Sequence, residues 1–100
     1  MVPAFQAERT LAGVLSELSS LALTVIVVDD GSRDRTLAIA REHGAHVVRH
    51  QDNRGKGAAL VTGMRAAAEE GFEVALTVDA DGQHPAESAR ALVDASSDRR

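Results

Sequence analysis

An uninterrupted run of apolar and β-branched residues at positions 23–28 constrains the fold of this 100-residue chain more than any other stretch. Such a run is typical of a strand buried on both faces of a parallel sheet. A helical pattern precedes it at residues 8–18, and a second helical pattern follows at about residues 32–43. Alternating helices and strands predict βα units with right-handed crossovers, so the chain is expected to be an α/β protein with a mostly parallel sheet.

The other elements are predicted from the same periodicities and from turn residues. Strands are predicted at residues 45–49 and 73–78, and residues 1–5 are at best a strand end followed by a turn, because Pro3 has no N–H. Helices are predicted at 57–70 and from Pro85 onwards. Gly44 and Gly71 are expected to end the helices before them. The helix at 8–18 should bury Leu11, Val14, Leu15 and Leu18. The side chains of the helix at 57–70 that should face the sheet are Leu60, Met64, Ala67 and Ala68.

Composition narrows the class of protein. The length fits a single domain or part of one, taken as residues 1–100. A net charge of −4 argues against a nucleic-acid surface, which depends on clustered lysine and arginine. The chain has no cysteine, which excludes disulfides and zinc-thiolate sites and fits a reducing compartment. No apolar run has the length of a membrane span. We therefore expect a protein of the cytoplasm or of the cytoplasmic face of a membrane.

Polar residues with possible chemical roles follow the predicted strands. Asp29 and Asp30 come directly after the strand at 23–28, the loop at 53–57 follows the next strand, and residues 79–84 follow the last. In open parallel sheets, ligands bind outside the carboxyl ends of the strands. The three segments are therefore expected to build one site.

The segment at 79–84 carries the strongest chemical signal. Asp79 and Asp81 lie one residue apart, with Gln83 and His84 just beyond, and such oxygen-rich clusters suit a hard divalent cation such as Mg²⁺ or Mn²⁺. An alternative is that the two acids only cap a turn before the helix at Pro85. A histidine at a helix start is more often a surface residue, so His84 is given a minor role.

Three motifs together carry a family resemblance. Residues 27–36 (Val-Val-Asp-Asp-Gly-Ser-Arg-Asp-Arg-Thr), 53–60 (Asn-Arg-Gly-Lys-Gly-Ala-Ala-Leu) and 79–85 (Asp-Ala-Asp-Gly-Gln-His-Pro) resemble, in order and spacing, the signatures of family 2 glycosyltransferases. The chain is most similar to the polyprenyl- or dolichyl-phosphate sugar synthase branch. The resemblance implies the Rossmann-like, donor-binding half of a GT-A fold, with strand order 3-2-1-4 and helices on both faces. It also implies an enzyme: an inverting, metal-dependent transferase of sugar from a UDP- or GDP-sugar to a lipid-phosphate or saccharide acceptor.

The resemblance assigns roles to individual residues. It implies metal contacts from Asp79, Asp81 and Gln83. It implies that Asp30 accepts a hydrogen bond from the donor's base. The nucleotide-sugar contacts that it implies are Pro3, Phe5, Asp29, Asp30, Arg54, Lys56, Asp79 and Ala80. The alternatives are that Asp29 and Asp30 only stabilise a turn, and that the 53–57 loop is a glycine-rich turn with two solvated cations.

The chain departs from the family pattern near its start. Only Met1 and Val2 precede Pro3, so the first strand is expected to be truncated and to leave neighbouring strands with unpaired ladder groups. Ala7 stands where the family has a carboxylate. No residue can be defended as the catalytic base, and we expect the acceptor region beyond residue 100, supplied by further segments or another chain. The alternative is a non-catalytic nucleotide-binding fragment or pseudoenzyme from a truncated gene.

Overall fold

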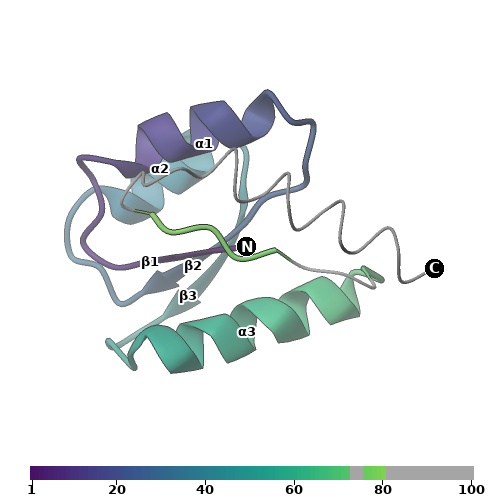
Figure 1. Cartoon of the computed structure of the whole chain (residues 1–100). Coiled ribbons are helices and arrows are strands. Elements are labelled where there is room, and N and C mark those ends of the chain that lie inside the picture. The colour runs from purple at the N-terminus through teal and green to yellow at the C-terminus, as the bar shows by residue number, and fades with distance from the viewer. Residues whose placement is uncertain (73–75, 81–100) are drawn as a thin grey trace.

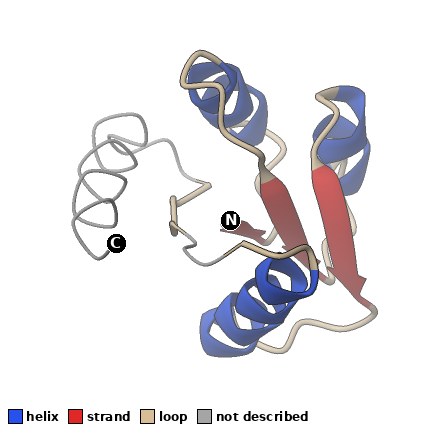
Figure 2. Cartoon of the chain, turned by 90° about the vertical axis from the view of Figure 1, so that its right-hand side faces the viewer, coloured by secondary structure: helices blue, strands red, loops and turns tan. Residues whose placement is uncertain are grey.

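The computed structural model describes residues 1–72 and 76–80, which form an α/β unit with helices on both faces of a parallel sheet. In chain order the elements are β1 (Val2–Ala4), α1 (Leu11–Ser19), β2 (Ile26–Asp30), α2 (Thr36–Glu42), β3 (His46–His50) and α3 (Lys56–Glu69). Helices α1 and α2 lie on one face of the sheet and α3 lies on the other (Figure 1, Figure 2). The predicted α/β class and the two-sided arrangement of helices are confirmed.

The sheet has the order β1-β2-β3, with β2 in the centre and every residue of β2 buried. Strand β2 pairs in parallel with both neighbours. Its ladder with β1 runs from Val2↔Val27 to Ala4↔Asp29. Its ladder with β3 runs from Ile26↔His46 to Asp30↔His50. This agrees with three strands of the predicted order 3-2-1-4. The fourth predicted strand begins in residues 73–75, which lie outside the described part, and no strand is formed over residues 76–80. The helix predicted from Pro85 also lies outside the described residues.

Strand β1 is short, yet it still joins its neighbours. It spans three residues against five in β2, and it pairs with β2 over its whole length. Beside it, the Met1 nitrogen donates to the Leu76 carbonyl at 2.5 Å, and the Val78 N–H donates to the Met1 carbonyl at 3.1 Å. We expected the truncated first strand to leave the second strand without a neighbour. This expectation is wrong for the residues of β2 that pair with β1.

Strand β2 ends later than its apolar run suggests. We predicted a strand over residues 23–28 followed by a polar turn, but Asp29 and Asp30 are the last two residues of β2. The reason is that the ladder with β3 continues through Asp29↔Arg49 and Asp30↔His50. Ladder pairing, rather than side-chain polarity, determines where this strand ends.

The larger part of the core lies between the sheet and the first two helices. All four predicted core residues of α1 are buried, which confirms the expected face of this helix. They pack with Val2 and Val27 of the sheet and with Ile39 and Ala40 of α2. Burial of these aliphatic side chains is the main force that holds α1 and α2 on this face.

Helix α3 packs against the sheet with small residues. Its buried positions are Ala59, Gly63 and Ala67, spaced four residues apart. Of the predicted face, Ala67 is confirmed, but Met64 is 58% exposed and Ala68 is also exposed. Small side chains let the helix approach closely, and a β-carbon at Gly63 would meet the Met1 side chain. The prediction favoured larger residues, whereas close packing selects the smaller ones.

Glycines end α2 and α3 as predicted. Gly44 and Gly71 have φ values of +74° and +90°, a region that favours glycine. After α2, the Ala45 N–H bonds to the Ala40 carbonyl and the Gly44 N–H bonds to the Arg41 carbonyl, at 3.2 and 3.0 Å. These two bonds form a Schellman motif, which satisfies the free carbonyls of the last helical turn.

Candidate nucleotide site

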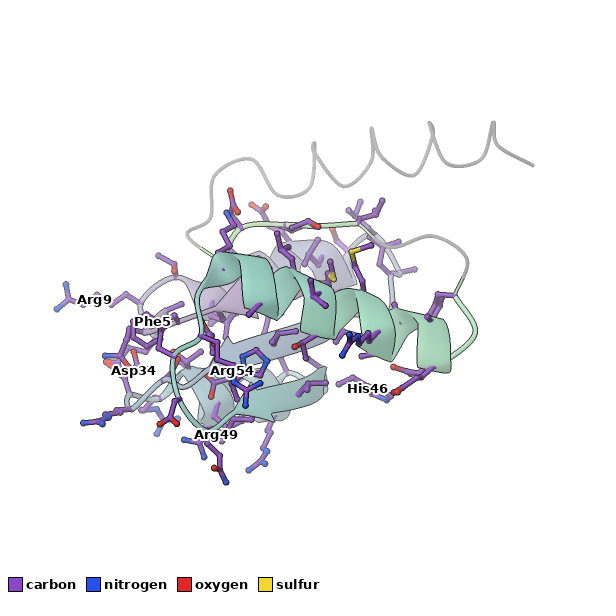
Figure 3. The ribbon with its side chains drawn as sticks, turned by 90° about the horizontal axis from the view of Figure 1, so that it is seen from below. Phe5, Arg9, Asp34, His46, Arg49 and Arg54 are labelled. Carbon is purple, nitrogen blue, oxygen red and sulfur yellow. The ribbon has the colours of Figure 1, made fainter. Side chains whose placement is uncertain are left out.

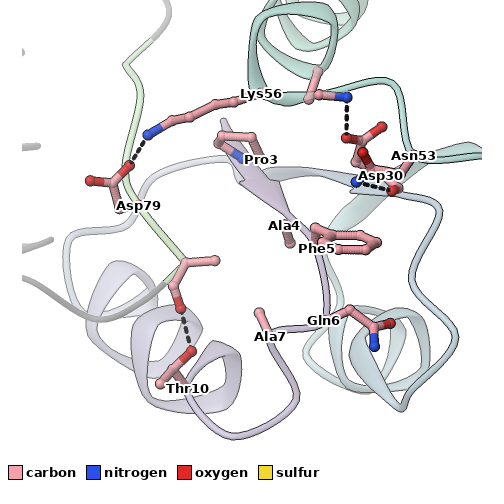
Figure 4. A pocket seen from close by; sticks show the side chains of 13 residues that line it. Pro3, Ala4, Phe5, Gln6, Ala7, Thr10, Asp30, Asn53, Lys56 and Asp79 are labelled. Carbon is pink, nitrogen blue, oxygen red and sulfur yellow. Dashed lines mark hydrogen bonds and ion pairs between the residues drawn. The ribbon is translucent and has the colours of Figure 1, made fainter.

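A pocket of about 460 Å³ lies at the carboxyl ends of the strands, where the loops after them converge (Figure 4). One wall is the segment after β1, a second combines Asp30 with the start of α3, and a third is the segment at residues 79–80. The pocket is lined by Pro3, Ala4, Phe5, Gln6, Ala7, Thr10, Asp30, Asn53, Gly55, Lys56, Ala59, Asp79 and Ala80. The predicted convergence of three segments is therefore observed for the described residues.

Asp30 holds the loop that begins α3. Its Oδ1 accepts the Arg54 N–H at 2.9 Å, its Oδ2 accepts the Gly55 N–H at 2.8 Å, and His50 Nδ1 lies 2.7 Å from Oδ1. Burial raises the pKa of the Asp30 carboxyl, but these hydrogen bonds outweigh burial and hold the pKa below its ordinary value. Asp30 is therefore an ionised, buried acceptor at the edge of the pocket.

Gly31 lets the loops after β2 and β3 touch through their backbones. Its φ is +78°, and a β-carbon there would lie 2.6 Å from Asn53 N and 2.6 Å from the Asp52 carbonyl carbon. Real β-carbons do not come so close to backbone atoms, so only glycine fits. Gly31 thus fixes the position of the residue 52–55 loop relative to Asp30.

Asp29 is not part of the pocket lining and supports the turn after β2. It is fully buried; Oδ1 accepts the Ser32 N–H at 3.0 Å, and Oδ2 lies 3.5 Å from Arg49 Nε. A carboxylate that accepts a backbone N–H three residues on is the turn-stabilising arrangement that we gave as the alternative. Contact of Asp29 with a ligand stays a prediction.

The segment after β1 is bonded to the loop after β2. The Gln6 N–H donates to Ser32 Oγ at 2.9 Å, and Gln6 Oε1 accepts the Arg33 N–H at 2.7 Å. The Ala7 N–H donates to Thr36 Oγ1 at 2.8 Å. These bonds join residues 26 to 29 positions apart and order one wall of the pocket. Ala7 lines this wall with a methyl group, so the wall has no carboxylate at that position.

Two contacts connect residues 79–80 to the other walls (Figure 4). Lys56 Nζ lies 2.9 Å from Asp79 Oδ1, and Thr10 Oγ1 donates to the Ala80 carbonyl at 2.6 Å. The Asp79 side chain is 48% exposed, and the Lys56 ammonium pairs with its Oδ1. Asp81, Gln83 and His84 lie outside the described residues. Within the described ranges, no three histidine, cysteine or acidic side chains are grouped to hold a metal.

The pocket lining contains most of the predicted contact residues. Six of the eight line it: Pro3, Phe5, Asp30, Lys56, Asp79 and Ala80. Arg54 contributes its backbone N–H to Asp30, and its side chain, like that of Asp29, is not in the lining. Phe5 lies at the pocket end of the molecule and His46 at the opposite end (Figure 3).

Sequence reasoning missed Gln6, Thr10 and His50. Gln6 and His50 each come directly after a predicted strand or strand end, which is a signal that could have found them. Thr10 lies within the helix predicted at 8–18, where no such signal marks it.

The geometry defines a parallel α/β protein with a pocket at the carboxyl ends of its strands. Comparison with known sequences identifies the class further: residues 1–100 match Glycosyl transferase family 2 along their whole length. The chain therefore belongs to this family.

Individual relatives agree with this assignment. The chain is 44% identical over 85 residues to an uncharacterized protein of Methanocaldococcus jannaschii, covering 84% of the chain and 35% of the relative. It is 32% identical over 102 residues to the UDP-N-acetylglucosamine–dolichyl-phosphate N-acetylglucosaminyltransferase of Methanococcus voltae, covering 84% and 41%. The chain thus spans about a third to two fifths of the length of these curated relatives.

A solved structure similar to this chain contains bound ligands. The chain is similar to glucosyl-3-phosphoglycerate synthase from Mycobacterium tuberculosis, crystallised with Mn²⁺, uridine diphosphate and glucosyl-3-phosphoglycerate. The TM-score is 0.67 at 31% identity, covering 84% of this chain and 34% of that protein.

Among the helices in the described part of the chain, none has the length and apolar character of a membrane span.

Proposed function

We propose that the chain is the donor-binding part of a glycosyltransferase that takes sugar from a UDP- or GDP-sugar. The observation that carries this proposal is the pocket itself, where an ionised buried acceptor, a helix N-terminus and an exposed carboxylate meet in a member of family 2. In this proposal residues 1–100 form one partial domain, and the acceptor site belongs to further segments or to another chain.

The base and the phosphates would be bound by different walls. Asp30 is the acceptor for a ring N–H of uracil or guanine, because a carboxylate excludes bases that present a lone pair there. Phe5, half exposed beside Pro3, offers an apolar ring face to the base. The Lys56 ammonium and the N-terminus of α3 favour the negatively charged diphosphate.

A divalent metal, Mg²⁺ or Mn²⁺, would be held by Asp79 together with Asp81 and Gln83. Bound there, it would supply Lewis-acid stabilisation of the diphosphate charge. The support is the exposed Asp79 carboxylate in the pocket and the Mn²⁺ of the similar solved structure.

The acceptor is proposed to be a lipid phosphate, with a saccharide hydroxyl as the second candidate. The support comes from the dolichyl-phosphate acceptor in the name of the Methanococcus voltae relative. Inverting transfer would need a base that deprotonates or orients this acceptor, and no described residue is assigned to that role.

A non-catalytic nucleotide-binding protein is the second candidate, favoured by Ala7. Its methyl group lines the pocket at the position where the family carries a carboxylate. In this candidate the pocket binds nucleotide without supporting transfer.

Calorimetric titration of the chain with uridine and guanosine diphosphate, with and without Mn²⁺, tests the proposal. Binding should be stronger with Mn²⁺, and Asp79→Asn should remove the metal-dependent part, since it replaces the carboxylate by an amide of the same shape. Glu42→Gln, a change at an exposed acid outside the pocket, is the matched control. Lack of binding by the folded wild-type chain would refute donor binding. Binding without sugar transfer from the full-length protein would favour the second candidate.

A further inference from the structure

The buried side chains of Asp30 and His50 and the partly buried side chain of Thr62 form a hydrogen-bonded row behind the pocket wall. His50, at the end of β3, is only 6% exposed; its Nδ1 lies 2.7 Å from Asp30 Oδ1 and its Nε2 lies 2.7 Å from Thr62 Oγ1. None of the roles derived above uses His50 or Thr62. Neither residue lines the pocket, so any effect on a ligand must pass through Asp30.

The chemistry of Asp30 fixes the direction of these bonds. An ionised carboxylate only accepts hydrogen bonds, so His50 Nδ1 carries the proton in this pair. In the neutral imidazole, Nε2 is then the acceptor, and the Thr62 hydroxyl donates to it. Asp30 on β2 thus sets the tautomer of His50 on β3, and the Thr62 hydroxyl on α3 holds the other ring nitrogen, so that the imidazole orients the carboxylate.

The hydrogen bond from His50 determines which oxygen of Asp30 can accept a hydrogen bond from a ligand. Oδ1 accepts from both His50 and the Arg54 N–H, whereas Oδ2 accepts from the Gly55 N–H. A carboxylate oxygen has two lone pairs, so Oδ1 is saturated and Oδ2 retains one acceptor direction for a ligand. Without His50, the carboxylate could rotate and exchange the roles of its two oxygens.

We propose that His50 is a positioning residue that orients the Asp30 carboxylate, keeps the Arg54–Gly55 loop in place, and thereby sets the base preference of the pocket. The base-preference part rests on the proposed function, whereas the orienting part concerns the protein without ligand. The three side chains are arranged like a nucleophile–histidine–acid triad. Thr62 is not in the pocket lining, however, so we assign the row the role of orienting the Asp30 carboxylate.

The first test needs no ligand. In His50→Leu, hydrogen exchange of the Arg54 and Gly55 amides, measured by NMR, should be roughly tenfold faster or more, as expected for loss of a hydrogen bond to a charged group. The Asp30 carboxyl, followed by its carbon chemical shift, should titrate at higher pH. His50→Gln retains an N–H donor and should restore part of both effects.

Two further variants separate orientation from general stability. Thr62→Val keeps the size of the side chain, removes only the hydroxyl, and should shift both readouts in the same direction by less. His46→Leu is the matched control, because His46 lies on the same strand, is exposed, and pairs with Glu70. Unchanged amide exchange and an unchanged Asp30 titration in His50→Leu and Thr62→Val would overturn the proposal. Should His50→Leu fail to fold, Thr62→Val and His50→Gln decide the question.

The second test measures base preference by binding of uridine and cytidine diphosphate. Wild type should prefer the uridine nucleotide, whose ring N–H can donate to Oδ2, and His50→Leu should reduce that preference roughly tenfold. An undiminished preference in His50→Leu would refute the base-setting role. Failure of wild type to bind uridine, cytidine or guanosine diphosphate would refute the proposed function, and exchange and titration would still decide whether His50 orients Asp30.

Discussion

Replacement of Gly31 by alanine should break the contact that joins the two loops at the pocket. The added β-carbon would lie 2.6 Å from Asn53 N and from the Asp52 carbonyl carbon, both backbone atoms that no rotamer change can move away. Alanine would also have to adopt the φ of +78°. The substitution therefore combines a conformational cost with a steric cost.

The structure offers a control that separates these costs. Gly44 has nearly the same φ, +74°, but a β-carbon there would have no atom within 4 Å. Gly44→Ala should cost only the left-handed conformation, roughly 1–2 kcal/mol of unfolding free energy. Gly31→Ala should cost that amount plus about 1–3 kcal/mol for overpacking, or about 2–5 kcal/mol in total.

Urea unfolding of both variants, followed by circular dichroism, measures the difference directly. In a domain of this size, 1 kcal/mol corresponds to about 4–8 °C in Tm, so thermal unfolding should also resolve the two variants. Equal losses for Gly31→Ala and Gly44→Ala would refute the close contact between the loops. A larger loss for Gly44→Ala would show that the steric argument is wrong altogether.

Further predictions concern buried side chains. Thr36→Val should cost about 0.5–1.5 kcal/mol in urea unfolding, because the partly buried Ala7 N–H loses its acceptor. Leu11→Ala should cost about 2–5 kcal/mol because this side chain is fully buried, whereas Met64→Ala should stay within about 0.5 kcal/mol; equal losses would contradict the assigned faces. Burial raises the pKa of Asp30 and Asp34, but hydrogen bonds outweigh burial and lower both pKa values. The free energy that these two carboxylates contribute to folding should be full above about pH 4 and decline as the pH falls further. In Asp30→Asn this decline should be less steep. An identical acid-unfolding profile in Asp30→Asn would contradict this account.

The sequence predicted the order and type of the described elements because their signals are local. The apolar spacing of α1 gave its buried face correctly, and Gly44 and Gly71 marked helix ends through a backbone conformation that other residues rarely adopt. The site was located by a general rule, that ligands bind at the carboxyl ends of parallel strands.

The errors arose where a distant partner decides the outcome. The end of β2 is set by pairing with β3, which the residues of β2 alone do not specify. The face of α3 is set by how closely the helix approaches the sheet at Gly63, and a pattern of large apolar residues points elsewhere. His50 follows a predicted strand, but its partners Asp30 and Thr62 could not be predicted because they lie 20 and 12 residues away in the chain.

The hydrogen bonds between the first loop and residues 32–36 affect the entropy of ligand binding. Gln6 and Ala7 are held through their backbone N–H groups by Ser32 and Thr36 before any ligand arrives. Ordering the backbone of one flexible residue costs roughly 1–2 kcal/mol, and a wall whose backbone is fixed in advance largely avoids that cost on binding. A ligand that enters this pocket therefore loses mainly its own freedom of motion, while the protein loses little.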